Sequence, residues 1–301
     1  MSNNRRVAVI GLGSMGGAMA TTLHSAGWEV AGFDPSEAAR DAAAQAGIST
    51  TAELQDLAGT PFVVLSLPSA AIVEATVPVL LSAPGTIAIV DTTTSEPATS
   101  KSMDILAESK GAAFIDAPVS GGREGAATGT LSAFVGASGT AAEAARPVLE
   151  ALTGGSYAHI GGPGSGNVVK LLNNVLAAAN LVSVGEALGV AKAYGIDPGV
   201  AAASISNASG GSKVSANMYP NWVLSGTHDS GFSLGLMARD AALAIDVARQ
   251  IGEQPELLAA AANQWQEALA ALGPAADFTE IARMIAPAIT PAGAPHKTTA
   301  A

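Results

Sequence analysis

Hydrophobic positions near the start of the chain come in short runs that alternate with stretches of helical spacing. Residues 6–10 (RVAVI) form an apolar run that ends at the glycines of GLGSMG. Residues 15–26 then carry apolar side chains at helical spacing, and residues 28–34 form a second run. A strand, a glycine turn, a helix and a second strand predict a βαβ unit of a parallel sheet.

The same alternation continues to about residue 161. We expect further strands at 61–68, 86–92, 112–118, 131–137 and 156–161, and helices at 36–46, 70–82, 97–110 and 141–152. The run at 61–68 is continuously apolar, which is typical of a strand covered by helices on both faces. The pattern predicts an N-terminal α/β domain with a doubly wound, mainly parallel sheet.

The periodicity changes after GGPGSG at 161–166. A single helical period runs from about 167 to 194, and later stretches also have helical spacing: one that begins near 197, and those at 233–251, 255–272 and 277–286. No strand-like segment follows residue 161, so the second domain is expected to be all-helical. The expected boundaries are 1–162 for the α/β domain, 163–287 for the helical domain, and 288–301 for a flexible tail.

Composition narrows the classes of function. The net charge is −11 and the isoelectric point about 4.7, which disfavours nucleic acid and anionic membranes as partners. The chain has no cysteine and only four scattered histidines, so we expect no metal site, and a cytoplasmic protein is favoured. The N-terminal apolar run is broken too early by glycines for a signal peptide. The long helix carries polar and charged residues that disfavour a membrane span, among them Lys170, Asn173, Asn174, Asn180, Glu186 and Lys192.

The first βαβ unit carries a dinucleotide-binding signature. Its turn has the pattern GxGxxG, formed by Gly11, Leu12, Gly13, Ser14, Met15 and Gly16. Glycines let the backbone approach a pyrophosphate, and the following helix offers free N–H groups and positive potential to it. Although a glycine turn could serve helix packing alone, its position between a strand and a helix favours a Rossmann-type cofactor domain.

Asp34 stands at the end of the second strand, 18 positions after Gly16. A carboxylate here can accept hydrogen bonds from both ribose hydroxyls but would repel a 2′-phosphate. Residues 35 and 36 are Pro and Ser, so no arginine stands beside the acid. The sequence therefore favours NAD and disfavours NADP, although Asp34 could also cap the helix at 36–46.

Four motifs in order resemble the β-hydroxyacid dehydrogenase family, which includes 3-hydroxyisobutyrate dehydrogenase and tartronate semialdehyde reductase. They are 11-GLGSMG-16, 116-DAPVSGG-122, 161-GGPGSGNVVKLLNN-174 and 236-LMARDAALA-244. The resemblance extends over about residues 5 to 287. It implies a Rossmann-type domain followed by a helical domain, NAD-dependent hydride transfer at a small 3-hydroxyacid, and a homodimer or homotetramer.

The resemblance also implies site residues. Ser120, Gly121 and Gly122 correspond to the loop that binds the substrate carboxylate and hydroxyl. Thr94 corresponds to the position beside the nicotinamide, and Leu67 and Pro68 end the strand that borders the same ring. One position departs from the family, because Arg239 stands where a lysine near cofactor and substrate is usual. Arg239 keeps the charge, which favours a cofactor contact, but its planar fork could also grip a second carboxylate.

Lys170 is the candidate catalytic residue. On a helix Lys170 and Asn174 share one face, whereas Asn173 lies about 100° away. A buried Lys–Asn pair could be purely structural, but this helix starts where the cofactor domain ends, which favours a place beside the ligand site. A partly desolvated lysine with a lowered pKa could take the hydroxyl proton during oxidation and return it during reduction. Asn174 would orient the lysine or hold the substrate hydroxyl.

Two other functions stay open at this point. An imine or ketone reductase could use the same scaffold, although Asp34 and Lys170 both oppose it. A non-catalytic NAD-sensing protein would keep GxGxxG and Asp34 but has no need of Ser120, Lys170 and Asn174 together. Candidate substrates are 3-hydroxyisobutyrate, glycerate or tartronate semialdehyde, threonate and 2-(hydroxymethyl)glutarate.

Overall fold

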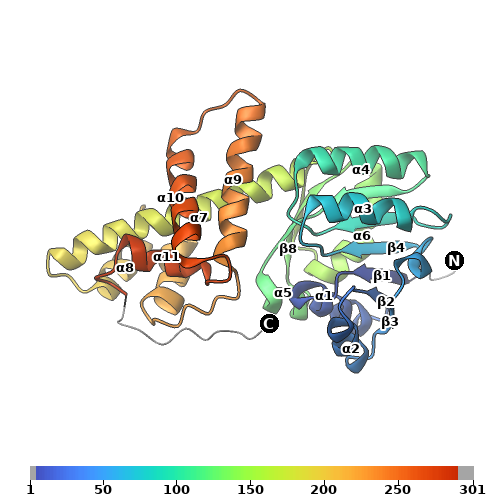
Figure 1. Cartoon of the computed structure of the whole chain (residues 1–301), viewed down its shortest axis with the longest axis horizontal. Helices are drawn as coiled ribbons and strands as arrows, with labels where there is room; N and C mark the ends of the chain where they lie inside the picture. The colour runs from blue at the N-terminus through green and yellow to red at the C-terminus, as the bar shows by residue number, and fades with distance from the viewer. Residues whose placement is uncertain (1–4, 291–301) are drawn as a thin grey trace. The chain divides into compact units, whose positions relative to one another are not determined.

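The computed structural model describes residues 5–290, which form two compact units that divide between Lys170 and Leu171. We call them the N-terminal unit and the helical unit (Figure 1). Of the tail expected at 288–301, residues 291–301 lie outside the described part of the chain.

The N-terminal unit is built on one nine-stranded sheet. Its strands are β1 (Arg6–Ile10), β2 (Glu29–Phe33), β3 (Ser49–Thr51), β4 (Phe62–Leu65), β5 (Ala88–Asp91), β6 (Ala113–Asp116), β7 (Val119–Ser120), β8 (Ser132–Gly136) and β9 (Tyr157–Gly161). Strands β3-β2-β1-β4-β5-β6 are parallel in this order, β8 is antiparallel to β6 and β7, and β9 pairs with β8 in parallel. The order 3-2-1-4-5-6 is that of dinucleotide-binding folds, so the expected doubly wound sheet is confirmed.

Helices cover both faces of this sheet (Figure 1). They are α1 (Ser14–Ser25), α2 (Glu37–Gln45), α3 (Ala70–Leu80), α4 (Pro97–Ser109), α5 (Gly122–Thr128) and α6 (Gly139–Thr153). Alternate residues of each strand face opposite layers. In β1, Val7 and Val9 join the core formed with α1 and α6, whereas Ala8 and Ile10 join the core formed with α3 and α4. Burial on both faces explains the continuously apolar strands.

Four short elements of the N-terminal unit were not expected from the sequence: β3, β7, α5 and the 3-10 turn η1 (Leu54–Leu57). Strands β3 and β7 contain three and two residues, too few to show a period. The α5 segment, GREGAAT, begins with a glycine and has no apolar period, so it resembles a loop.

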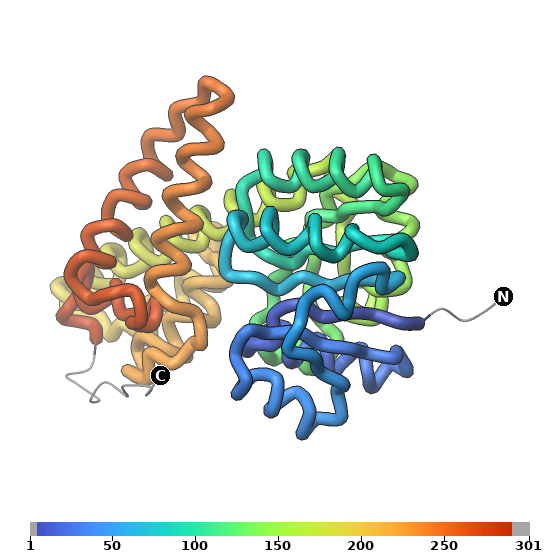
Figure 2. Tube along the Cα trace, turned by 45° about the vertical axis from the view of Figure 1, so that its right-hand side comes forward, coloured from blue at the N-terminus to red at the C-terminus, as the bar shows by residue number. Residues whose placement is uncertain are grey.

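The helical unit has no strand after Gly161 among the described residues, apart from an isolated bridge between Ser233 and Asp277. Its elements are α7 (Ser165–Ala193), which begins in the N-terminal unit, α8 (Pro198–Ser206), the π-helix η2 (Val214–Val223), α9 (Leu234–Gln250), α10 (Glu256–Leu272), η3 (Phe278–Glu280) and α11 (Ile281–Ile285). Helices α9 and α10 form an antiparallel pair, side by side in Figures 1 and 2. The all-helical expectation is confirmed, while η2 was not foreseen.

Aromatic side chains fix α7 within the helical unit. Trp265 of α10 is fully buried, stacks on Phe278 and donates from Nε1 to the carbonyl of Ala178 at 3.2 Å. The Tyr219 hydroxyl donates to the carbonyl of Leu181 at 2.6 Å. Burying a polar tip requires such a partner, so these two rings hold the middle of α7 in one register.

Among residues 5–290, α7 is the one helix long and apolar enough to cross a membrane. Half of its most apolar window is buried inside the protein. That burial is the behaviour of a core helix packed against its own chain.

Candidate active site

The GxGxxG turn follows β1 and leads into α1. Gly11 has φ +88°, and a Cβ there would collide with the carbonyl oxygen of Ser66. A Cβ at Gly16 would collide with the carbonyl oxygen of Gly11, whereas a Cβ at Gly13 meets nothing within 4 Å. Gly11 and Gly16 therefore pack the turn tightly, and Gly13 leaves open space where α1 begins at Ser14. A pyrophosphate fits this arrangement.

Asp34 is bonded directly to this turn. Its Oδ2 accepts the backbone N–H of Leu12 at 2.8 Å, and its Oδ1 accepts the N–H of Ser36 at 2.8 Å. Each carboxylate oxygen keeps a further lone pair for a ribose hydroxyl. The side chain that caps α2 is Ser36, which accepts the N–H of Ala39, so Asp34 is not that cap. The residues present fit NAD.

Arg40 is a cation near Asp34 that the sequence did not single out. Its Nη1 donates to the carbonyls of Asp34 and Pro35, at 2.7 and 3.1 Å. Arg40 is six positions from Asp34 in the sequence, and the first turn of α2 brings it back to the end of β2. Arg40 thus places a guanidinium at the same turn as the carboxylate.

The positions expected beside the nicotinamide lie at the carboxyl edge of the parallel sheet, where such folds bind ligands. Leu67 and Pro68 follow β4, and the backbone N–H of Leu67 donates to Thr93 Oγ1 at 3.1 Å. Thr94 follows β5 and is half-buried, while Pro68 is exposed. The loops after β4 and β5 are therefore tied to each other, next to the glycine turn after β1.

The SGG motif is a strand end and a helix start. Ser120 ends β7, and Gly122 begins α5. Gly121 and Gly122 have φ +127° and +63°, values that side-chain-bearing residues rarely adopt, and a Cβ at Gly122 would meet nothing within 4 Å. Backbone conformation explains both glycines. Arg123, the next residue, is exposed.

Asp116, the first residue of the DAPVSGG motif, is fully buried, and its carboxylate accepts hydrogen bonds from the backbone at the start of α7. Its Oδ1 accepts the N–H of Gly164 at 2.7 Å and its Oδ2 the N–H of Asn167 at 2.9 Å. Desolvation raises the pKa of Asp116 to about 7, and these backbone N–H groups oppose the rise. The sequence alone did not assign a role to Asp116. The one sign of its importance in the sequence is that a charged residue stands in an otherwise apolar strand.

Asp91 lies opposite Asp116 in the register of β5 and β6. Its Oδ1 accepts the N–H of Thr93 at 3.0 Å, but its buried Oδ2 has no hydrogen-bond partner among the described residues. Desolvation, with a smaller contribution from Asp116, raises the pKa of Asp91 to about 7. Both oxygens of Asp116 accept N–H groups, whereas Oδ2 of Asp91 accepts none, so these contacts stabilise the charged form of Asp116 more than that of Asp91.

Lys170 is half-buried on α7, three residues after Asn167. Asn167 is fully buried, and its side chain accepts the N–H of Ser95 at 2.9 Å and donates to Ser100 Oγ at 3.1 Å. Hydrogen bonds of Asn167 therefore hold the turn of α7 before Lys170 against the segment that follows Thr94.

Asn174, one turn after Lys170, is buried in the helical unit. Its Nδ2 donates to Asp240 Oδ2 at 2.7 Å. The other oxygen of Asp240 accepts Nε and Nη2 of Arg239, at 3.0 and 2.8 Å. Asn173 is exposed and donates to Asn174 Oδ1 at 3.1 Å. Asp240, another residue that sequence reasoning left without a role, thus orients both Asn174 and Arg239.

The loop around His228 contains polar side chains of the helical unit that are bonded to each other. His228 has φ +44°, and its Nδ1 lies 2.9 Å from Thr279 Oγ1. Ser230 donates to Asp277 Oδ2 at 2.5 Å. Desolvation and the nearby Arg283 lower the pKa of His228. These bonds fix the loop onto η3.

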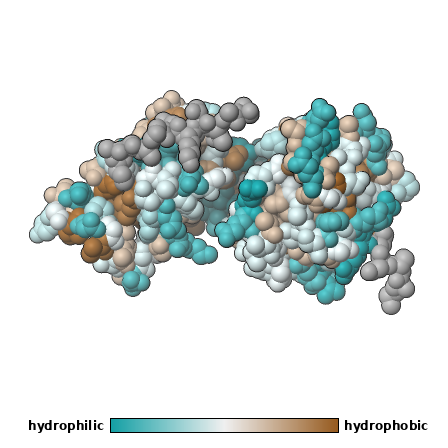
Figure 3. Space-filling model, turned by 90° about the horizontal axis from the view of Figure 1, so that it is seen from below, coloured by the Kyte–Doolittle hydropathy of each residue, from teal (hydrophilic) through white to brown (hydrophobic). Residues whose placement is uncertain are grey.

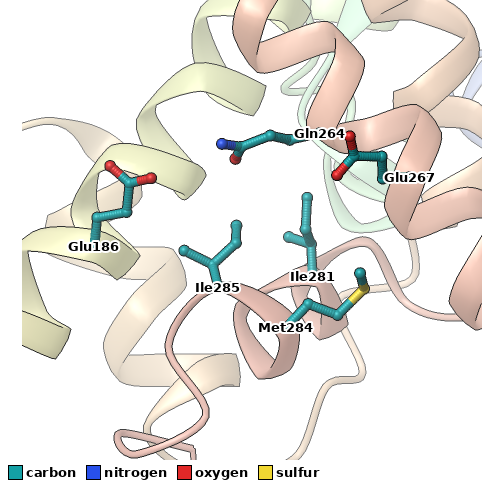
Figure 4. Close-up of a pocket in the computed structure, with 6 residues that line it drawn as sticks. All are labelled: Glu186, Gln264, Glu267, Ile281, Met284 and Ile285. Carbon is teal, nitrogen blue, oxygen red and sulfur yellow. The ribbon is translucent and has the colours of Figure 1, made fainter.

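A pocket of about 230 Å³ also lies in the helical unit, lined by Glu186, Gln264, Glu267, Ile281, Met284 and Ile285 (Figure 4). None of the expected site residues lines this pocket. Within residues 5–290 no group of three His, Asp or Glu side chains could hold a metal ion.

Two family models match the chain. Residues 6–161 match the NAD binding domain of 6-phosphogluconate dehydrogenase, and residues 164–285 match the NAD-binding region of NADP-dependent 3-hydroxyisobutyrate dehydrogenase. Together they cover almost all described residues.

Individual relatives agree with these models. The chain is 34% identical to 2-(hydroxymethyl)glutarate dehydrogenase of Eubacterium barkeri, over 91% of this chain and 92% of the relative. It is 36% identical to the NAD-dependent L-serine dehydrogenase of Pseudomonas aeruginosa, over 81% and 86%. The solved structure of Mycobacterium tuberculosis 3-hydroxyisobutyrate dehydrogenase with L-serine superposes with a TM-score of 0.86 at 30% identity, covering 93% and 99%.

Imine reductases are more distant. That of Streptomyces aurantiacus has a TM-score of 0.62 at 22% identity, which indicates a shared fold alone. The chain therefore belongs to the β-hydroxyacid dehydrogenase family, and it is an NAD-dependent oxidoreductase that acts on the CH–OH group of a hydroxyacid.

Proposed function

We propose that the substrate is a 3-hydroxypropanoate that carries a substituent at C2, and that Lys170 is the general acid/base. The compounds for which these relatives are named share this skeleton: 2-(hydroxymethyl)glutarate, L-serine and 3-hydroxyisobutyrate each have a CH₂OH group and a carboxylate on the same carbon. They differ only in the third substituent of that carbon. The reaction would oxidise the primary alcohol to a semialdehyde and reduce it in reverse.

The observation that carries the catalytic assignment is the position of Lys170 on α7. It is half-buried, it lies one turn before Asn174, and the preceding turn is bonded through Asn167 to the segment after Thr94. An amine on a bonded, half-buried helix turn is well suited to move one proton in a defined direction.

The chemistry can be written for the chain's own groups. NAD, when bound, supplies the acceptor for the hydride that leaves the hydroxyl-bearing carbon. The neutral amine of Lys170 takes the hydroxyl proton as that hydride departs, and the resulting ammonium later gives the proton to solvent. In the reverse direction the ammonium stabilises the developing oxyanion and protonates it. Ser120 with the N–H groups of Gly121 and Gly122 would hold the substrate carboxylate.

Replacement of Lys170 by alanine tests this assignment. We expect kcat to fall by at least about 10²-fold, the usual contribution of a general acid/base, while NADH binding measured by fluorescence stays nearly unchanged. Lys192, exposed near the other end of the same helix, provides the matched control. Lys192→Ala should retain normal turnover, and near-normal turnover of Lys170→Ala would remove Lys170 from catalysis.

The substituent at C2 can be identified with a panel of hydroxyacids and NAD. Arg239 bears on this point because its guanidinium is bonded to Asp240, which favours a fixed contact over a mobile specificity group. We expect Arg239→Lys to change the KM for NAD and to affect 3-hydroxyisobutyrate and 2-(hydroxymethyl)glutarate equally. A loss confined to the dicarboxylate would instead assign Arg239 to the second carboxylate.

We also infer that the active form is a homodimer or homotetramer. Helix α7 presents large apolar side chains to solvent, with Leu172, Leu176 and Val190 exposed by 42, 52 and 71%. Hydrophobic surface is visible on the helical unit in Figure 3. Exposed apolar surface of this kind is typical of an interface. Light scattering coupled to size exclusion checks it: a monomer at micromolar concentration contradicts the inference. A cytoplasmic location stays a prediction.

Imine reduction is the alternative activity on this scaffold, but the likeness to imine reductases, at 22% identity, concerns the fold alone. The retention of Asp34 opposes NADPH as the donor. We expect any imine reduction with NADH to be far slower than hydroxyacid oxidation.

A further inference from the structure

The Asp116 carboxylate closes the first turn of α7. It accepts the N–H groups of Gly164 and Asn167, which belong to the donors that a helix leaves unsatisfied at its start. Gly164 precedes the helix and has no side chain that could cap it. A carboxylate from β6 therefore takes the place of a local cap, and its charge is stabilised by the helix dipole.

Two glycines make room for this contact. A Cβ at Gly136 would lie 2.5 Å from Asp116 Oδ1 and 2.6 Å from the backbone nitrogen of Gly166. A Cβ at Gly166 would lie 2.7 Å from the carbonyl oxygen of Asp116. Strand β6, strand β8 and the start of α7 thus meet at a point where only glycine fits, and the helix start cannot slide without breaking that packing.

Asn167 provides a second tie from the same turn. Its side-chain oxygen accepts the N–H of Ser95, the residue after Thr94, and its amide donates to Ser100 of α4. Its backbone N–H is the one held by Asp116. Asp116 therefore orients Asn167, and Asn167 fixes α7 against the segment that carries Thr94.

We propose that Asp116 is a positioning residue that sets Lys170 relative to the nicotinamide side of the site. This inference rests on the proposed function of Lys170. Lys170 lies three residues after Asn167, about 4.5 Å along the helix axis at 1.5 Å per residue, so a shift of the first turn moves it directly. Displacement of a catalytic group by about 1 Å costs about 10²-fold in rate.

Asp91 offers a matched control for Asp116. It is equally buried and lies opposite Asp116 in the register of β5 and β6. Its Oδ1 accepts the backbone N–H of Thr93, and its Oδ2 has no hydrogen-bond partner among the described residues. Asparagine mimics the protonated acid in shape and keeps that acceptor. At position 116, asparagine would instead place its NH₂ group against the backbone N–H of Gly164 or Asn167, which needs an acceptor.

The test compares the steady-state kinetics of Asp116→Asn and Asp91→Asn in the full chain. NAD is the cofactor, and the best hydroxyacid of the panel is used once unlabelled and once deuterated at C3. For Asp116→Asn we expect kcat to fall at least about tenfold, the KM for NAD to change less than about twofold, and the deuterium isotope effect on kcat to rise. For Asp91→Asn all three should stay within about twofold of the unaltered enzyme. A purely structural loss would reduce the active fraction and leave the isotope effect unchanged.

Normal kcat and isotope effect in Asp116→Asn, or equal damage in Asp91→Asn, overturns the proposal. If Asp116→Asn does not fold, Ser100→Ala replaces it, because this substitution removes the hydroxyl that accepts the side-chain amide of Asn167. We expect Ser100→Ala to lower kcat a few-fold and to raise the isotope effect. Normal kinetics in Ser100→Ala would also contradict the proposal. Lys170→Ala separates the two hypotheses. Turnover in Lys170→Ala contradicts the proposed function, whereas an inactive Lys170→Ala beside a normal Asp116→Asn contradicts only this inference.

Discussion

The side-chain amide of Asn174 donates to the buried carboxylate of Asp240 across 2.7 Å. Because a carboxylate bonded to Arg239 can only accept, this contact fixes which end of the amide faces Asp240. Asn174 must point its Nδ2 at Asp240 and its Oδ1 away. The amide of Asn174 is therefore held in one orientation by Asp240.

The first prediction concerns the hydrogen bond between Asn174 and Asp240. Asp240→Asn should lower kcat/KM by about 10- to 100-fold, because a hydrogen bond to a charged group contributes about 1.5–3 kcal/mol. The double variant Asn174→Asp with Asp240→Asn rebuilds an amide–carboxylate bond in the opposite sense and should recover folding stability but not activity. Thermal unfolding and steady-state kinetics measure the two effects, and equal recovery of both would show that the orientation of the amide does not matter.

Asp34 and Arg40 give the second prediction. Asp34→Ser removes the charge that repels a 2′-phosphate, while Arg40 already places a guanidinium at the same turn. We expect the single substitution to raise kcat/KM for NADP relative to NAD by at least about tenfold. Adding Arg40→Ala should reverse much of that gain. An unchanged NADP/NAD ratio in Asp34→Ser would mean that another group selects the cofactor.

Asp91 gives the third prediction, which concerns stability against pH. Its pKa is about 7 in the folded protein and its ordinary value is 3.8, so between these values the folded state holds a proton that the unfolded state has lost. The free energy of unfolding should therefore fall as pH rises from about 4 to about 7, by up to about 1.4 kcal/mol per pH unit from this group. Asp91→Asn should abolish this component.

Urea unfolding of both proteins at several pH values measures the difference between them. Asp41→Asn, at an exposed aspartate of the same unit, serves as control and should leave the pH dependence as in the unaltered protein. A wild-type slope in Asp91→Asn would place the proton elsewhere, with Asp116 as the first alternative.

The sequence predicted the long periodic elements because each has enough residues to reveal a period. Strand β1, helix α1 and helix α7 are examples, and the parallel sheet followed from their order. It did not predict β3, β7 or α5, since their two to seven residues are defined by pairing with distant strands or by glycine backbone angles. The π-helix η2 was also missed, because its wider turn depends on packing that no local pattern encodes.

For the site, local motifs identified positions but not partners. GxGxxG, Asp34 and the Lys170–Asn174 spacing are readable along the chain. Arg40, Asp116 and Asp240 act through contacts with residues that the fold brings to them, over separations of up to 66 positions for Asp240 and Asn174. A buried charge within an apolar element was the available signal for the two aspartates, and such a signal gives no partner.

The bond between Asp34 and the N–H of Leu12 has a consequence for cofactor affinity. The turn that would receive the pyrophosphate is preorganised, because its backbone is already held by the side chain that would hold the ribose. Little of the binding free energy would then be lost to ordering the loop. Two parts of the dinucleotide, the pyrophosphate and the adenosine ribose, would meet a single rigid surface whose two halves are joined by one hydrogen bond.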